Sequence, residues 1–147
     1  MLARLALALA LAACGESETD KFVDDYTPLN DRLLKIGAEL GDALEAVDSQ
    51  SDAALEKRFS ALAKQLEDVN GEISALDTPA DLQDEAKGLN TALDAATGDV
   101  EDIAKAAGAK DAEDVAGATL QLSSDSQEVN SAQNKLARAT GAEVGQR

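Results

Sequence analysis

The chain has few residues that could do chemistry, and the most reactive of them is its single cysteine, Cys14. A lone thiol cannot form an intramolecular disulfide. Histidine is absent, so the chain lacks the usual general base near neutral pH and the commonest ligand of metals and haem. Carboxylates outnumber basic residues 29 to 13, which gives a net charge of −16. A thiol and many acids without histidine exclude most catalytic arrangements.

The residues before Cys14 have the pattern of a processed N-terminus. Arg4 supplies a short positive region, and an apolar run from Leu5 to Ala13 ends in small residues. The run is too short to cross a bilayer as a helix, which needs about 20 residues. Its end resembles the lipobox of bacterial lipoproteins, with the sequence Leu11, Ala12, Ala13 and Cys14.

In that family the cysteine sulfur receives a diacylglycerol, a dedicated peptidase cuts just before the cysteine, and the new amino group is often acylated. Two or three acyl chains anchor a protein stably, whereas one gives only marginal binding. The resemblance implies signal cleavage between Ala13 and Cys14, lipidation of Cys14, and a place on the cell membrane or outer membrane, facing outside the cytoplasm. Two alternatives stay open: an uncleaved apolar helix with Cys14 buried, and a secretory signal cut elsewhere.

These signals divide the chain into four expected parts. They are a signal peptide at 1–13, a lipidated cysteine with an acidic tether at 14–19, a helical bundle at 20–141 and a flexible tail at 142–147. Loss of Arg4 with the signal peptide would lower the net charge by one unit, from −16 to −17. No basic face for nucleic acid is visible, and anionic headgroups would repel this chain. Cations, basic protein surfaces and hydrogen-bonding polymers remain as partners.

Acidic residues gather in four clusters. They are Asp24-Asp25; Asp81 with Asp84 and Glu85; Asp99 with Glu101 and Asp102; and Asp111 with Glu113 and Asp114. None has the Asp-x-Asp-x-Asp-Gly spacing that wraps oxygens around calcium. Several fall in expected first turns, where acids interact favourably with the helix dipole. We interpret the clusters mainly as solvated surface, with a weak cation site as the alternative.

Two enzyme classes that use carboxylates do not fit. Di-metal carboxylate bundles need inward Glu-x-x-His motifs, whereas the inward positions here are apolar. Carboxylate-pair glycosidases need acids across a cleft with stacking groups, but Phe22, Tyr26 and Phe59 all fall on expected core stripes. We expect no enzyme, no cofactor, and no catalytic, cofactor-binding or metal-binding residue.

The elements that must position these groups are helices. Ala and Leu supply most of the apolar content, and only Pro28 and Pro79 interrupt helix formation. Apolar residues recur at alternating spacings of three and four in four segments, about 20–47, 52–76, 77–107 and 111–140. The first stripe is Phe22, Tyr26, Leu29, Leu33, Ile36, Leu40, Leu44 and Val47. Thr27-Pro28 either caps or kinks this helix. The fourth stripe is weakest, because Ser126 occupies an apolar position.

Capping residues mark the ends of the segments. Thr78 and Pro79 fit the N-cap and first position of the third helix, and Gly108 fits the left-handed residue that ends it. Asp111 is expected to start the fourth helix and Gly141 to end it.

Small and polar residues inside the helices indicate where a groove could form. Helical glycines are expected at Gly37, Gly41, Gly71, Gly88, Gly98 and Gly117. Each is less favourable in a helix than Ala by up to about 1 kcal/mol. They therefore mark close helix approach, tolerated surface, or a groove, for which Gly88, Gly98 and Gly117 are the first place to look. Three asparagines follow seam residues: Asn70, Asn90 and Asn130. They are expected to border the core or to make a polar contact at its flank, and Ser126 marks a polar pocket or a looser layer.

The short links predict an all-α, antiparallel up-down four-helix bundle with an N-terminal lipidated tether. Two long hairpins that complete their core by dimerising are the runner-up. The chain also resembles small Ala-rich helical lipoproteins of high-GC bacteria in its lipobox, its Tyr-containing first helix and its Thr78-Pro79-Ala80-Asp81-Leu82 segment. That group carries no assigned activity. We expect a membrane-anchored binding or scaffolding module with an envelope protein or polymer as partner. An acidic cation-binding lipoprotein is the alternative, and ligand and oligomeric state stay open.

Overall fold

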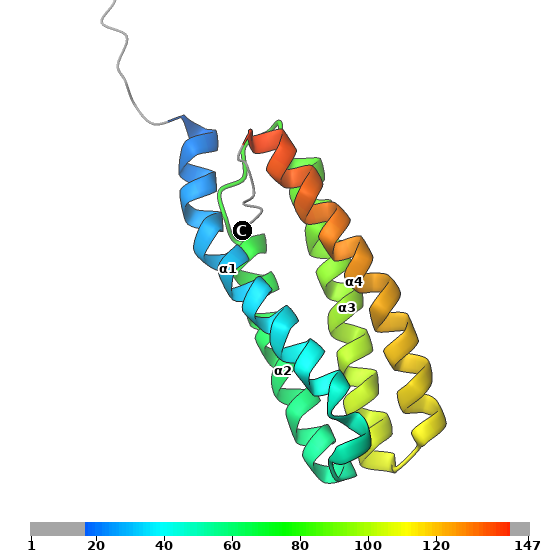
Figure 1. Cartoon of the computed structure of the whole chain (residues 1–147). Helices are drawn as coiled ribbons and strands as arrows, with labels where there is room; N and C mark the ends of the chain where they lie inside the picture. Colours follow the sequence, from blue (N-terminus) through cyan, green and yellow to red (C-terminus); the bar gives the residue numbers. More distant parts are fainter. Residues whose placement is uncertain (1–16, 142–147) are drawn as a thin grey trace, which may run out of the picture.

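A computed structural model of the chain describes residues 17–141 and shows an all-α bundle of four long helices in that range (Figure 1). The helices are α1 (Glu18–Glu45), α2 (Asp52–Ser74), α3 (Gln83–Ala109) and α4 (Ala112–Thr140), with a short 3-10 helix, η1 (Val47–Ser49), between α1 and α2. The predicted four-helix bundle is confirmed. The predicted signal peptide, the lipidated cysteine with the first two residues of its tether, and the tail lie outside the described residues, whereas tether residues 17–19 form the cap and start of α1.

The helices alternate in direction, so the three links divide between the two ends of the bundle. The start of α1, the α2–α3 link and the end of α4 lie at one end, and the α1–α2 and α3–α4 links lie at the other (Figure 1). Packing is uneven around the bundle. α3 packs extensively on α2 and α4, whereas α1 packs mainly on α2 and approaches α4 closely at only a few positions. The seam between α1 and α4 is therefore the loosest.

The core consists of the side chains that the three-four spacing predicts. Its largest fully buried members come from all four helices and the α2–α3 link: Phe22, Phe59, Ile73, Leu82, Leu89, Leu93, Ile103, Leu122 and Leu136. Burial of one such side chain contributes roughly 1.5–3 kcal/mol. Phe22 and Tyr26 add a stacked aromatic pair, with ring centroids 5.8 Å apart. Four helices thus bury one core within a single chain.

The fourth stripe is the weakest, as the sequence predicts. Val115, Leu122 and Leu136 are buried, but Ser126 and Val129 between them are only half-buried. Polar side chains therefore share the inward face of α4 with apolar ones, and they make the polar contacts described below.

The N-terminal half of α1 differs from the prediction at two points. The helix begins at Glu18, two residues before the expected start, because Ser17 forms a capping box with Asp20. Pro28 lies inside the helix, so of the two predicted alternatives the cap by Thr27 is wrong, and Pro28 is part of a longer helix. The Thr27 hydroxyl instead donates to the Val23 carbonyl at 2.7 Å, within the helix.

The start of α3 is a correction to the sequence analysis. Thr78 does not cap this helix, because α3 begins at Gln83 after a turn in which the Leu82 N–H donates to the Pro79 carbonyl at 3.0 Å. Leu82 is 1% exposed, and Pro79 is also buried. Burial of these two side chains holds the link as a turn before the helix starts. This packing outweighs the local preference of Thr78-Pro79 to start a helix.

The end of α3 differs too, whereas α4 follows the prediction. Gly108 is helical, and the left-handed residue is Lys110, with φ 60°. The Asp111 N–H donates to the Ala106 carbonyl at 2.9 Å, which completes a Schellman-type end. Asp111 then caps α4 through the N–H groups of its first turn, and Gly141 ends α4 with φ 68°.

Candidate functional site

The residues that carry the strongest sequence signal are not among those described. Leu11, Ala12, Ala13 and Cys14 all precede Ser17, the first described residue. The Ser17 side chain accepts from the Asp20 N–H at 3.0 Å, so the folded body begins three residues after Cys14. Within the folded body, the candidate functional groups are the acidic clusters and the hollows between helices.

Most acidic clusters serve helix ends or face solvent. Asp24 and Asp25 are exposed on α1. Glu113 and Asp114 lie in the first turn of α4, where their charge favours the helix dipole. Within residues 17–141, no group of three or more acids or cysteines lies close enough together to hold a metal ion.

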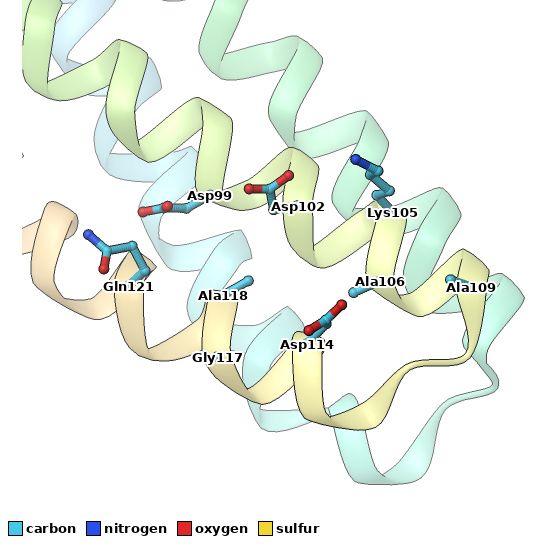
Figure 2. A pocket seen from close by; sticks show the side chains of 9 residues that line it. All are labelled: Asp99, Asp102, Lys105, Ala106, Ala109, Asp114, Gly117, Ala118 and Gln121. Atoms are coloured by element: carbon cyan, nitrogen blue, oxygen red, sulfur yellow. The ribbon is translucent and has the colours of Figure 1, made fainter.

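Asp99 is the exception, because it enters the interface between α3 and α4. A hollow of about 480 Å³ lies there, and Asp99, Asp102, Asp114, Gly117 and Gln121 are among the residues that line it. Figure 2 shows Asp99 extending from α3 toward Gln121 of α4. One carboxylate oxygen of Asp99, Oδ2, is fully buried and has no hydrogen-bond partner among the described atoms.

This environment raises the pKa of Asp99 from 3.8 to about 6. Burial is the largest cause, followed by a hydrogen bond to Asp125 and the negative charges of Asp125 and Asp102. Asp125 also accepts a hydrogen bond from Gln121, whose Nε2 donates to Asp125 Oδ1 at 3.2 Å. Asp99 therefore forms an acid pair with Asp125, and Asp99 exchanges its proton near pH 6.

Sequence reasoning found half of this pair. Asp99 belongs to a predicted acidic cluster, but its Glu101 and Asp102 neighbours are exposed. The partner that matters, Asp125, was missed. The available signal was Ser126 on the weakest stripe, because it indicated a polar layer beside the position that Asp125 occupies.

A second polar contact lies between α2 and α3. Asn70 is 7% exposed, and its Nδ2 donates to the Asn90 carbonyl at 3.4 Å and to Asp94 Oδ1 at 2.5 Å. The predicted flank contact therefore forms between the segments that carry Asn70 and Asn90. Asn130 is exposed on α4 and takes no part in it. This cluster ties α2 to α3, and it holds no nucleophile.

The six glycines predicted inside helices do not mark close helix packing in the described part of the chain. A Cβ added at Gly88, Gly98 or Gly117 would meet nothing within 4 Å. Gly117 lines the hollow beside Asp99, and Gly88 lines a second one of about 720 Å³ farther along the same α3–α4 face. Two of the three glycines for which a groove was predicted therefore line hollows, whereas Gly98 is not among the residues that line either one.

A third hollow, of about 590 Å³, lies at the end of the bundle that holds the α1–α2 and α3–α4 links. Its walls include Leu44, Val47 and Leu55 from one side and Val115 and Leu120 from the other. We call it the distal groove, because it is far from Ser17. It is the most apolar of the three described, and it opens at the loose seam between α1 and α4.

Tyr26 connects α1 to α4 at the opposite end. The Tyr26 hydroxyl and Gln133 Nε2 both donate to Asn30 Oδ1, at 3.3 Å and 3.1 Å. Burial raises the pKa of Tyr26 to about 12, and a hydrogen bond with Gln133 opposes this in part. A phenol with this pKa keeps its proton at neutral pH, so its role is to join the helices.

The chain matches no protein-family model, and searches of curated proteins and of solved structures found no significant similarity. Among residues 17–141, no helix combines the length and apolar character needed to cross a membrane.

Proposed function

We propose that the chain is the precursor of a lipid-anchored cell-envelope lipoprotein whose helical body is a non-catalytic binding or scaffolding module. The observation that carries this proposal is the lipobox-like sequence Leu11-Ala12-Ala13-Cys14 at the end of a short apolar run. Lipid on the Cys14 sulfur would hold the body on the outer side of the cell membrane or on the outer membrane.

The body is suited to such a design because the buried side chains of its described core all follow Cys14 in the sequence. The buried apolar side chains of the described part come from residues 22–137, and α1 starts with its own capping box at Ser17. Cleavage before Cys14 would therefore remove nothing that the described core uses. The short distance from Cys14 to Ser17 would keep this end of the bundle close to the membrane.

A binding role fits the described side chains better than catalysis does. Asp99 exchanges a proton beside Asp125, but no thiol, lysine or activated hydroxyl is hydrogen-bonded to this pair in the described contacts. Nucleophilic catalysis requires a nucleophile next to its base. The alternative, a cation-binding lipoprotein, has the carboxylates that line the Asp99 hollow in its favour, but they do not form a cluster that could hold a metal ion.

The anchor is tested by mass spectrometry and fractionation of the protein made in a bacterial host. The native chain should lack residues 1–13, carry a diacylglyceryl group on Cys14 and sediment with membranes. The Cys14→Ser variant should lack the lipid mass, and it should no longer sediment with membranes. Ser17→Ala is the matched control, because it alters a neighbouring residue and keeps the thiol. An unmodified Cys14 on a chain that retains residues 1–13 would overturn the proposal.

A further inference from the structure

We propose that the distal groove binds a cationic amphipathic helix of a partner protein. This inference deepens the proposed function and depends on it only for the position of the groove relative to the membrane. The groove itself is a feature of the described helices, with about 590 Å³ of space between the α1–α2 side and the start of α4.

The groove is mainly apolar, because eight of its twelve lining residues are Leu, Val or Ala. Leu44 and Val47 pack only partly on the core, and Val115 faces them from α4. Leu120 is 75% exposed although it lines the same hollow. An exposed leucine beside a partly buried apolar wall is the arrangement that a partner's apolar side chains would cover.

A helix is the occupant that fits this surface. The first turns of α4 form one wall of the groove, and Ala112 and Ala116 on this wall are small enough to let another backbone approach. Amphipathic helices bind such grooves by inserting apolar residues at spacings of three and four. A ligand of this kind would complete the loose seam that α4 leaves open beside α1.

The charge of the body selects a cationic helix. Residues 17–141 carry a net charge of −16, because the two acids and two bases outside this range cancel. The groove is bordered by Asp52 and Asp111, with Lys110 as the only basic residue among those that line it. A second copy of the chain carries the same negative charge and would be repelled, whereas lysine or arginine on the polar face of a helix would be attracted.

The position of the groove gives such a partner access. α1 has 28 residues, so at 1.5 Å per residue it separates the two ends of the bundle by about 40 Å. Ser17 lies at one end, and the links that border the groove lie at the other (Figure 1). With Cys14 lipidated, the distal groove would face away from the membrane.

Binding is tested with a fluorescent 18-residue peptide of Leu and Lys whose leucines occupy one helical face, added to the full-length chain at physiological salt. Leu120→Glu should weaken binding at least tenfold. Leu34→Glu is the matched control, because Leu34 is 58% exposed and is not among the residues that line the groove. Both variants add the same negative charge, which by itself attracts the peptide. A tenfold loss confined to Leu120→Glu therefore reports apolar contact in the groove.

Two further measurements make the outcome decisive. Ala116→Glu, an exposed substitution on the same wall, should weaken binding as Leu120→Glu does. A peptide of equal composition with scrambled leucines should bind at least tenfold more weakly than the amphipathic one. The proposal would be overturned if the two peptides bound equally well, or if the two leucine variants bound the peptide equally well. It would also be overturned if the unsubstituted chain formed a dimer that Leu120→Glu abolished. The assay does not depend on lipid, so its failure is distinguishable from failure of the anchor.

Discussion

Asp99 shows how one side chain can make the bundle sensitive to pH. Its raised pKa means that the folded protein holds a proton that the unfolded chain releases near pH 4. The stabilising effect of that proton is complete below about pH 4 and is lost as the pH rises through about 6. At neutral pH the ionised Asp99 faces Asp125 across a partly buried interface and lies near Asp102 on its own helix. Repulsion among these charges destabilises the packing of α3 against α4.

Asp99→Asn should therefore stabilise the protein at pH 7 and have little effect at pH 4. An asparagine keeps the shape of the protonated acid and can donate to Asp125 without carrying charge. We expect the free energy of unfolding to rise by about 1 kcal/mol at pH 7, a value reduced to allow for solvent screening of a partly exposed group. Chemical denaturation at both pH values measures this difference.

The matched control for that prediction is Asp31→Asn on α1. Asp31 is exposed, so its substitution removes the same unit of charge without changing a buried contact. The gain in stability at pH 7 should be confined to Asp99→Asn. An equal gain in Asp31→Asn would mean that net charge explains the effect. A loss of stability in Asp99→Asn at pH 7 would mean that the charged Asp99 carboxylate is stabilising.

Glycine substitutions should have opposite signs at two positions. Gly98 is in the interior of α3, and an added Cβ there meets open space, so Gly98→Ala should raise the free energy of unfolding by about 0.5–1 kcal/mol. Gly141 has φ 68°, which disfavours any side chain, so Gly141→Ala should lower it by about 1 kcal/mol. Thermal unfolding of the two variants tests the pair. A loss in Gly98→Ala would indicate that another surface approaches that glycine.

At the scale of the helices, the position of a cap decides where an element begins. The Asp111 carboxylate accepts from the N–H groups of Glu113 at 3.2 Å and Asp114 at 3.1 Å, and Asp111→Ala should lower the free energy of unfolding by about 1 kcal/mol. Thr78→Ala should change it by less than about 0.5 kcal/mol, because Thr78 caps no helix. If the Thr78 substitution proves as costly as that at Asp111, α3 begins where the Thr-Pro sequence predicts.

The sequence was sufficient for the number, type and buried face of the helices, because the three-four spacing of apolar residues depends only on helix geometry. It failed at both ends of α3. The burial of Leu82 and the left-handed Lys110 are decided by how the links pack on other helices, and no local pattern contains that information. The sequence therefore predicted the wrong ends for this helix, with Thr78 as its N-cap and Gly108 as its left-handed end.

The candidate site divides in the same way. Cys14 is recognisable because a lipobox is a contiguous pattern, whereas the pairing of Asp99 with Asp125 depends on the rotation and axial position of α3 against α4. The distal groove was not predicted either. A stripe tells which face of a helix is buried, but not which neighbour covers it, so the loose seam between α1 and α4 emerges only from the assembled bundle.

For the whole molecule, the dominant physical quantity is unbalanced negative charge. Within residues 17–141 three ion pairs join oppositely charged side chains: Arg32–Glu72 at 2.7 Å, Lys35–Glu39 at 3.8 Å and Lys64–Asp68 at 3.3 Å. All of them are exposed, and exposed pairs contribute about 0–1 kcal/mol each. With a net charge of −16, most carboxylates repel one another across the surface, and this lowers the stability of the compact state.

Salt should therefore stabilise the bundle by screening. Raising NaCl from 10 mM to 0.1 M shortens the Debye length from about 30 Å to about 10 Å, and we expect the melting temperature to rise by about 5 °C. CaCl2 at the same ionic strength should act similarly, with no saturable heat in calorimetry, because the described carboxylates form no cluster that could hold the ion. Sucrose at equal osmolality is the control for solvent exclusion. Because it is uncharged and does not screen, it should not reproduce the rise in melting temperature. Saturable calcium binding at fixed stoichiometry, lost in Asp99→Asn, would instead favour the cation-binding alternative, since screening has no stoichiometry and no dependence on one carboxylate.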